Sequence, residues 1–191
     1  MIADVWHTMR MKSKVSNLVF DVAQLVQPNG KILDIGCGTG YPNAHFFAQN
    51  GFDVMGIDFS ENMLNFAKQA GIPNAKFELI DFFEFEPVDM YDGIVAYDSF
   101  FHFDLCDQAS IYPRVASWMN PGAVLFFTHG KQKSVKEGEM FGQNFYYSCL
   151  DVSELCVIMN QSHLEIIKII ENYVEDDMDR DLVVFARKIS T

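Results

Sequence analysis

The sequence predicts an α/β protein built on a doubly wound, mostly parallel, Rossmann-like sheet of seven strands. Three observations predict this fold class. Short apolar runs typical of strands alternate with segments of helical spacing, a glycine-rich turn follows the first such run, and two β-rich runs near the end flank an acidic loop. Because that loop carries no helical signal, we expect the last two strands to form an antiparallel hairpin. The length of 191 residues suits a single domain, residues 1–191.

The first part of the chain has helical spacing. Apolar residues recur with the helical period over residues 14–26, and Pro28, Asn29 and Gly30 end that helix. Together with the residues before it, this helix would form an N-terminal helical cap, residues 1–27. Trp6 either has no chemical role or belongs to an N-terminal lid.

Strands and helices then alternate. The expected strands are residues 31–35, 52–57, 76–80, 93–97, 123–128, 164–170 and 182–186. Pro42 suits the first position of the helix after the glycine turn, and Ser60 suits the N-cap of the next helix. Residues 105–119 are expected to be helical with a kink or break at Pro113, and Asp151 begins a pattern that resembles a capping box.

The net charge of −12 argues against partners that need a basic surface. Lysine and arginine form no dense run, so we expect no nucleic-acid partner. No stretch approaches the ~18 consecutive apolar residues of a membrane-spanning helix, and residues 1–10 do not resemble a signal peptide. We therefore expect a cytoplasmic protein without a membrane partner.

The four cysteines show neither CxxC spacing nor a metal-ligand pattern. They are Cys37, Cys106, Cys149 and Cys156. We interpret them as reduced thiols, which agrees with a cytoplasmic location, and we expect no metal site.

The segment from Asp34 to Gly40 carries the most information about function. A strand ends at Ile35, glycines alternate through the turn, and a helix follows. Glycines permit positive φ and let a ligand approach the backbone, and the carboxyl ends of strands are where open α/β sheets bind ligands. A dinucleotide-binding turn would need a third glycine to complete GxGxxG, but Tyr41 occupies that position.

The pattern acid-x-Gly-x-Gly-x-Gly resembles the first motif of the class I S-adenosylmethionine-dependent methyltransferases. Its residues here are Asp34, Gly36, Gly38 and Gly40. The resemblance extends from Lys31 to the final strand. It implies that the cofactor is S-adenosylmethionine and that these four residues contact it, with Asp34 near the methionine amino group or bracing the turn.

Three later positions match the order of motifs in that family. The resemblance implies that Asp58, at the end of the second strand, holds the ribose hydroxyls, and that Asp81, after the third, accepts from the adenine amino group. Phe59 and Phe82, which follow these acids, either pack on adenine or belong to the core. Tyr97, at the end of the fourth strand, would line the methionine portion.

The acceptor side has four candidate catalytic residues. Asp98 and His102 follow the fourth strand, and His129 follows the fifth. A histidine titrates near neutral pH and could act as a base, although a structural role is equally open for each. Tyr146 lies in residues 130–148, a glycine-punctuated segment without a clean period that could fold over the acceptor as a lid.

These features predict transfer of a methyl group to a small-molecule acceptor by direct displacement at the sulfonium carbon. Residues 96–100 lack the Asn/Asp-Pro-Pro-aromatic motif of enzymes that methylate exocyclic base nitrogens or glutamine amides. Two alternatives remain open. One is a non-catalytic S-adenosylmethionine-binding regulatory module, and the other is a nicotinamide-dependent oxidoreductase, against which Tyr41 and Asp81 both count.

Overall fold

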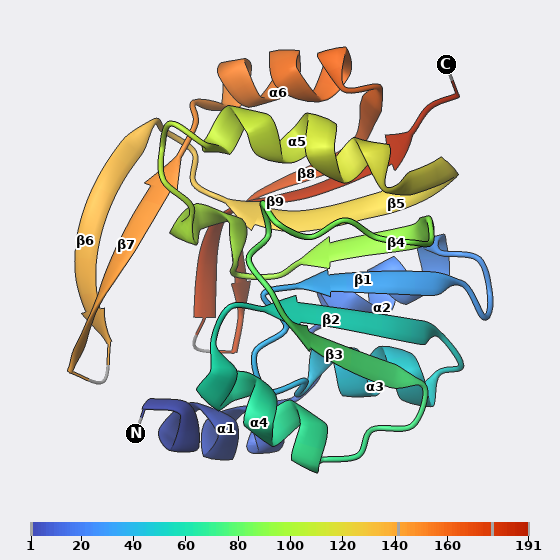
Figure 1. Ribbon diagram of the computed structural model, residues 1–191. Helices are drawn as coiled ribbons and strands as arrows, with labels where there is room; N and C mark the ends of the chain where they lie inside the picture. Colours follow the sequence, from blue (N-terminus) through green and yellow to red (C-terminus); the bar gives the residue numbers. More distant parts are fainter. Residues whose placement is uncertain (1, 141, 177, 191) are drawn as a thin grey trace. The chain divides into compact units, whose positions relative to one another are not determined.

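The computed structural model describes every residue except 1, 141, 177 and 191 (Figure 1). The chain divides into two compact units, Met1–Val95 and Ala96–Thr191. No helix among the described residues is long and apolar enough to span a membrane.

In the first unit, two helices precede an alternation of strands and helices. Its elements are α1 (Ile2–Lys12), α2 (Asn17–Leu25), β1 (Lys31–Ile35), α3 (Asn43–Gln49), β2 (Asp53–Asp58), α4 (Glu61–Gln69), β3 (Ala75–Leu79) and β4 (Tyr91–Ala96). The strands are parallel and lie in the order β3-β2-β1-β4. In the register, Ile35 of β1 lies beside Ile57 of β2, so both strands end at the same edge.

Local capping explains where the helices of the first unit begin. The Ser60 hydroxyl accepts from the backbone N–H of Met63, which confirms the predicted N-cap of α4. Pro42 lies one position earlier than predicted, at the N-cap of α3 rather than inside it. The predicted helix over residues 14–26 is α2, and α1 forms a second helix before it.

The second unit contains the remaining elements. They are the 3₁₀ helix η1 (Phe100–His102), α5 (Gln108–Ser117), β5 (Met119–His129), β6 (Ser134–Met140), β7 (Gln143–Cys149), α6 (Val152–Gln161), β8 (Leu164–Glu175) and β9 (Met178–Lys188). Strands β5, β9 and β8 are neighbours in that order with antiparallel pairing, which confirms the predicted C-terminal hairpin. With β1 to β4 they make the predicted mixed, mostly parallel set of seven strands, and β6 and β7 form a separate two-stranded sheet.

Two predictions about the second unit were wrong in detail. Helix α5 continues through Pro113 without a break, and it begins at Gln108 rather than at residue 105. Strands β8 and β9 are 12 and 11 residues long, so Glu175 ends β8 instead of lying in a loop. The sequence left the secondary structure of residues 130–148 open, and most of this segment forms the β6–β7 hairpin (Figure 1).

Candidate active site

The glycine turn after β1 is held directly on β2. The backbone N–H groups of Gly36 and Cys37 both donate to the carbonyl of Ile57, at 2.9 and 3.1 Å. Gly40 has a φ of 77°, and a Cβ there would lie 2.9 Å from the Phe77 ring. This position therefore accepts only glycine without a shift of the packing around it.

Asp58 fixes the turn from the end of β2. Its Oδ2 accepts from the backbone N–H of Gly38 at 2.8 Å, and its Oδ1 accepts from the N–H of Ser60 at 2.8 Å. One carboxylate thus joins the glycine turn to the start of α4.

Asp34 is a buried acid beneath the same turn. Its side chain belongs to β1, and the residue is 3% exposed. The pKa of Asp34 is raised to about 7, mainly because burial disfavours the charged carboxylate; the Arg10 guanidinium lowers this pKa, and the Asp58 charge raises it. Near pH 7 this carboxyl is therefore partly protonated.

Helix α1 lies next to the glycine turn. The indole Nε1 of Trp6 is 3.8 Å from the point that a Cβ on Gly38 would occupy. The His7 ring stacks on Phe66 of α4 with centroids 4.3 Å apart, and the guanidinium carbon of Arg10 lies 5.4 Å from the Trp6 ring centroid. Sequence reasoning missed His7 and Arg10, although the four-residue spacing of Trp6 and Arg10 on one helix face was a usable signal.

The adenine-side candidates follow β2 and β3. The backbone N–H of Ile80 donates to the Asp58 carbonyl at 3.1 Å, so the two strand ends are joined. Asp81 is exposed, and its Oδ1 accepts from the backbone N–H of Phe83 at 2.7 Å. Phe82 is 5% exposed whereas Phe59 is 80% exposed, so the two predicted aromatics differ sharply in environment.

In the second unit, Asp98 forms a buried ion pair that the sequence did not reveal. Arg180 of β9 donates from Nε to Oδ1 and from Nη2 to Oδ2, at 2.9 and 2.7 Å. The Thr128 hydroxyl also donates to Oδ1, at 3.1 Å, and Asp98 has a φ of 54°, which is uncommon for a residue with a side chain. The guanidinium carbon lies 4.4 Å from the Tyr97 ring centroid.

His102 lies against the β6–β7 hairpin. Its Nδ1 is 3.0 Å from the Tyr146 carbonyl oxygen. Because a carbonyl can only accept, we assign the proton to Nδ1 and the lone pair of the neutral ring to Nε2. The ring also packs 5.0 Å from Tyr147 and 5.7 Å from Phe145.

The base of the hairpin is joined to the loop after β4 through buried polar groups. Gln108 is fully buried, and its Nε2 donates to the Phe100 carbonyl at 2.7 Å and to the Ser148 hydroxyl at 3.1 Å. The Ser148 hydroxyl donates in turn to the Phe103 carbonyl at 2.7 Å. His102 therefore lies in a loop that is bound to β7.

His129 lies at the carboxyl end of β5 and is 3% exposed. Its Nδ1 donates to the Gly130 carbonyl at 2.6 Å, and burial lowers its pKa. Its buried Nε2 has no hydrogen-bond partner among the residues described. The ring is therefore neutral near pH 7, with its lone pair on Nε2.

Comparison with known proteins finds a methyltransferase domain. Residues 32–122 match the sequence model of a methyltransferase domain, and this region contains the glycine turn, Asp58 and Asp81. The chain is 32% identical over 107 residues to phosphoethanolamine N-methyltransferase 3 of Arabidopsis thaliana. The match covers 54% of this chain and 21% of the plant protein, so the chain spans about a fifth of that relative's length.

Solved structures of methyltransferases share the fold. One from Methanosarcina mazei superposes with a TM-score of 0.74 at 20% identity, covering 93% of this chain and 99% of that chain. The 1,6-didemethyltoxoflavin-N1-methyltransferase of Burkholderia thailandensis, solved with 1,6-didemethyltoxoflavin and S-adenosylhomocysteine, has a TM-score of 0.71 at 16% identity. That similarity covers 99% of this chain and 86% of the Burkholderia chain.

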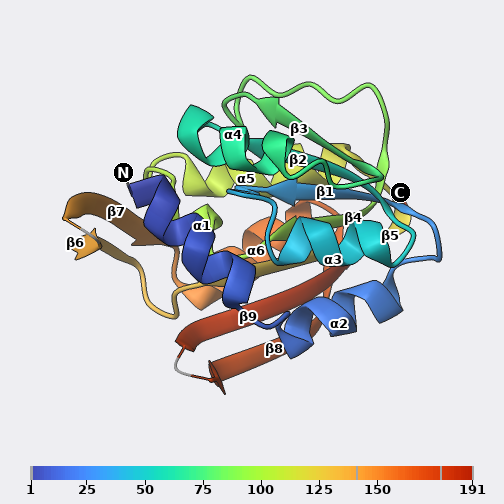
Figure 2. The ribbon, with the colours of Figure 1, turned by 90° about the horizontal axis from the view of Figure 1, so that it is seen from below.

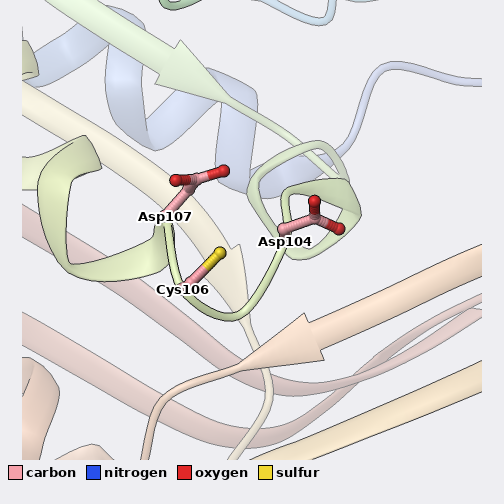
Figure 3. A group of neighbouring side chains, drawn as sticks. All are labelled: Asp104, Cys106 and Asp107. Atoms are coloured by element: carbon pink, nitrogen blue, oxygen red, sulfur yellow. The ribbon is translucent and has the colours of Figure 1, made fainter.

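Among the described residues, one group of side chains could share a metal ion. Asp104, Cys106 and Asp107 lie at the start of α5 with their potential ligand atoms within 4.8 Å of one another (Figure 3). Asp104 and Cys106 are exposed. None of the candidate site residues belongs to this group.

Proposed function

We propose that the protein transfers the methyl group of S-adenosylmethionine to a small-molecule acceptor. The observation that carries the proposal is the glycine turn pinned by Asp58 at the edge where β1 and β2 end. Such a turn lies at the carboxyl ends of parallel strands, which is where open α/β sheets bind ligands.

The residues of the turn fit this cofactor. Gly38 and Gly40 both have positive φ, and the lack of side chains there lets a ligand lie against the backbone. The Thr39 hydroxyl is 1% exposed and has no hydrogen-bond partner among the described residues. A bound polar ligand would satisfy such a group, which otherwise costs about 1–3 kcal/mol.

The cofactor's three portions would follow the edge of the strands. Asp58 would accept from the ribose hydroxyls, and Asp81 would accept from the adenine amino group. Phe59, which is 80% exposed, would supply apolar surface for the adenine ring, and the buried Phe82 would support it from the core. Asp34 and Gly36 would complete the contacts to the methionine portion.

The chemistry makes few demands on the protein. The bound cofactor supplies an electrophilic methyl group on a sulfonium, whose sulfur leaves without needing a proton. The protein aligns the acceptor and excludes water, and such positioning contributes about 7–11 kcal/mol. If the acceptor must lose a proton, His102 and His129 are the candidate bases, since each neutral ring has its lone pair on Nε2.

A small molecule is the acceptor class best supported. The net charge of −12 disfavours nucleic acid, and the names of two similar proteins specify phosphoethanolamine and 1,6-didemethyltoxoflavin. Asp98 and Tyr146 would line the acceptor site. A screen of small acceptors that detects S-adenosylhomocysteine tests the activity. Cofactor binding without turnover of any acceptor class would instead indicate a regulatory binding module.

Replacing Asp58 with Ala should weaken S-adenosylmethionine binding at least about tenfold, because each hydrogen bond to a charged group contributes ~1.5–3 kcal/mol. Isothermal titration calorimetry measures the change. The matched control is Asp53→Ala, at the exposed opposite end of β2, which should bind as the wild type does. Thermal unfolding separates lost contacts from a disrupted turn, since Asp58 also accepts from Gly38 and Ser60. An unchanged dissociation constant would remove Asp58 from the site.

We also propose that the β6–β7 hairpin is a mobile cover for the acceptor. Near its tip, Glu139, Gln143 and Asn144 are exposed, whereas its base is held through Ser148. Hydrogen exchange in residues 138–147 should slow when S-adenosylhomocysteine and an acceptor bind, because ligands would hold the cover closed. Strong protection that is equal with and without ligands would identify a fixed element instead.

A further inference from the structure

We propose that Arg180 is a positioning residue of the acceptor site, where it holds the Asp98 carboxylate in one orientation toward the methyl acceptor. This role rests on the proposed function, in which Asp98 lines that site, and it adds a residue of β9 to the acceptor side. It also specifies the chemistry of the group that meets Asp98, which must carry an N–H or O–H donor.

Arg180 lies where β9 extends past the end of β5. The last residue of β5 is His129, which pairs with Leu182, and Arg180 precedes that pair in β9. This part of β9 still pairs with β8, with Tyr173 beside Arg180, and the two strands lie side by side (Figures 1 and 2). Because ligands bind at the carboxyl ends of strands in open α/β sheets, the extension places Arg180 at the ligand-binding edge of the second unit.

Three hydrogen bonds hold the Asp98 carboxylate in place. Arg180 donates from Nε to Oδ1 at 2.9 Å and from Nη2 to Oδ2 at 2.7 Å, and the Thr128 hydroxyl donates to Oδ1 at 3.1 Å. The backbone N–H of Asp98 donates to the same Thr128 hydroxyl at 2.9 Å. Since the planar fork of a guanidinium bonds both oxygens at once, it fixes the plane of the carboxylate as well as its position.

The backbone at Asp98 also needs this support. Its φ of 54° lies in the left-handed region, which a residue with a side chain adopts when its surroundings hold it there. Arg180 is itself held by the Tyr97 ring, whose centroid lies 4.4 Å from the guanidinium carbon. The carboxylate is therefore positioned before a ligand arrives, and a ligand does not have to order it.

The Asp98 side of the pair is open to a ligand. The Arg180 side chain is 6% exposed, whereas that of Asp98 is 25% exposed. Among the described residues, Oδ1 accepts two hydrogen bonds and Oδ2 accepts one. A carboxylate oxygen has about two lone-pair sites, so Oδ2 retains the capacity for one more bond. Because a carboxylate accepts hydrogen bonds and donates none, the group of the acceptor that binds there carries an N–H or O–H.

The test measures the acceptor KM and the number of cofactor sites in the same preparations of the full chain. The acceptor is the compound turned over fastest in the screen that detects S-adenosylhomocysteine. Arg180→Gln should raise the acceptor KM at least about tenfold, as expected when a charge-assisted hydrogen bond is misaligned. Its dissociation constant for S-adenosylmethionine should stay within about twofold of the wild-type value.

The KM separates positioning from stability. Partial unfolding of Arg180→Gln would lower the number of sites counted by calorimetry, and the apparent kcat with it, while the folded molecules kept the wild-type KM. Arg180→Lys keeps the charge but not the fork, so it should retain part of the acceptor affinity. If the glutamine variant does not fold, the lysine variant decides in its place. The matched control is Arg187→Gln in the same strand, which should leave the KM unchanged.

A double-mutant cycle shows whether Arg180 acts through Asp98. Asp98→Asn should also raise the KM, and adding Arg180→Gln to it should change the KM by no more than about twofold, because the positioned group is already altered. An unchanged KM in the folded Arg180 variant, or fully additive effects in the cycle, would overturn the role of Arg180. Cofactor binding by the wild type without turnover of any acceptor would instead overturn the proposed function, and this inference with it.

Discussion

Arg180→Met should lower the free energy of unfolding by about 3 kcal/mol, because removing one partner of a buried ion pair leaves the Asp98 carboxylate without its counter-charge. The Arg180 side chain is 6% exposed and that of Asp98 is 25% exposed, which places the loss at the low end of the usual range. Urea denaturation measures it. The control is Arg187→Met in the same strand. Among the described residues the Arg187 guanidinium donates to the exposed Gly122 carbonyl alone, so this change should alter stability by less than about 0.5 kcal/mol.

A double-mutant cycle isolates the ion pair from the rest of the arginine's packing. Asp98→Asn removes the negative charge, so Arg180→Met should lower the free energy of unfolding much less in that background than in the wild type. Strictly additive losses would mean that the arginine stabilises β9 through its stacking on Tyr97 rather than through Asp98.

Asp34→Asn should raise stability at pH 8 while weakening binding of the cofactor's amino group. The native pKa of about 7 exceeds the usual value of 3.8, so the folded protein holds more protons than the unfolded chain between these two values. Stability therefore falls as pH rises through this window, and the full penalty, on the order of 4 kcal/mol at ~1.4 kcal/mol per pKa unit, is present above it. Asparagine has no charge to bury and escapes that penalty.

Denaturation at pH 5 and pH 8 checks this prediction. The wild type should lose more stability than Asp34→Asn between these two pH values, and Asp53→Asn, at the exposed start of β2, should keep the wild-type slope. Identical pH slopes for wild type and Asp34→Asn would mean that Asp34 is ionised throughout and compensated by its surroundings.

The sequence predicted the glycine turn and the strand ends around it, for a physical reason. The turn from Asp34 to Gly40 is a local structure whose glycines are required by positive φ, and the parallel register brings the ends of β1, β2 and β3 to one edge. These relations follow from strand order and from residue type alone. The fold class was predictable on the same grounds.

The Asp98–Arg180 pair could not be predicted in this way, since its partners are 82 residues apart. Arg180 lies in a strand extension that we expected to be an acidic loop, and an isolated arginine there has no pattern. The bond between His102 and Tyr146, across 44 residues, likewise depends on a hairpin that has no alternating period. Tertiary contacts between isolated polar residues leave no periodic trace in a sequence.

Because of the hydrogen bonds that attach it, the β6–β7 hairpin can vary in sequence while its attachment is kept. Its base is held largely by hydrogen bonds to main-chain carbonyls, at Phe100 and Phe103 on the loop and at Tyr146 on the hairpin. Carbonyls are present whatever the side chain, so the side chains that must keep their identity in these hydrogen bonds are His102, Gln108 and Ser148. Hairpin residues outside these bonds and outside the packing of Phe145 and Tyr147 on His102 can change without disturbing the attachment.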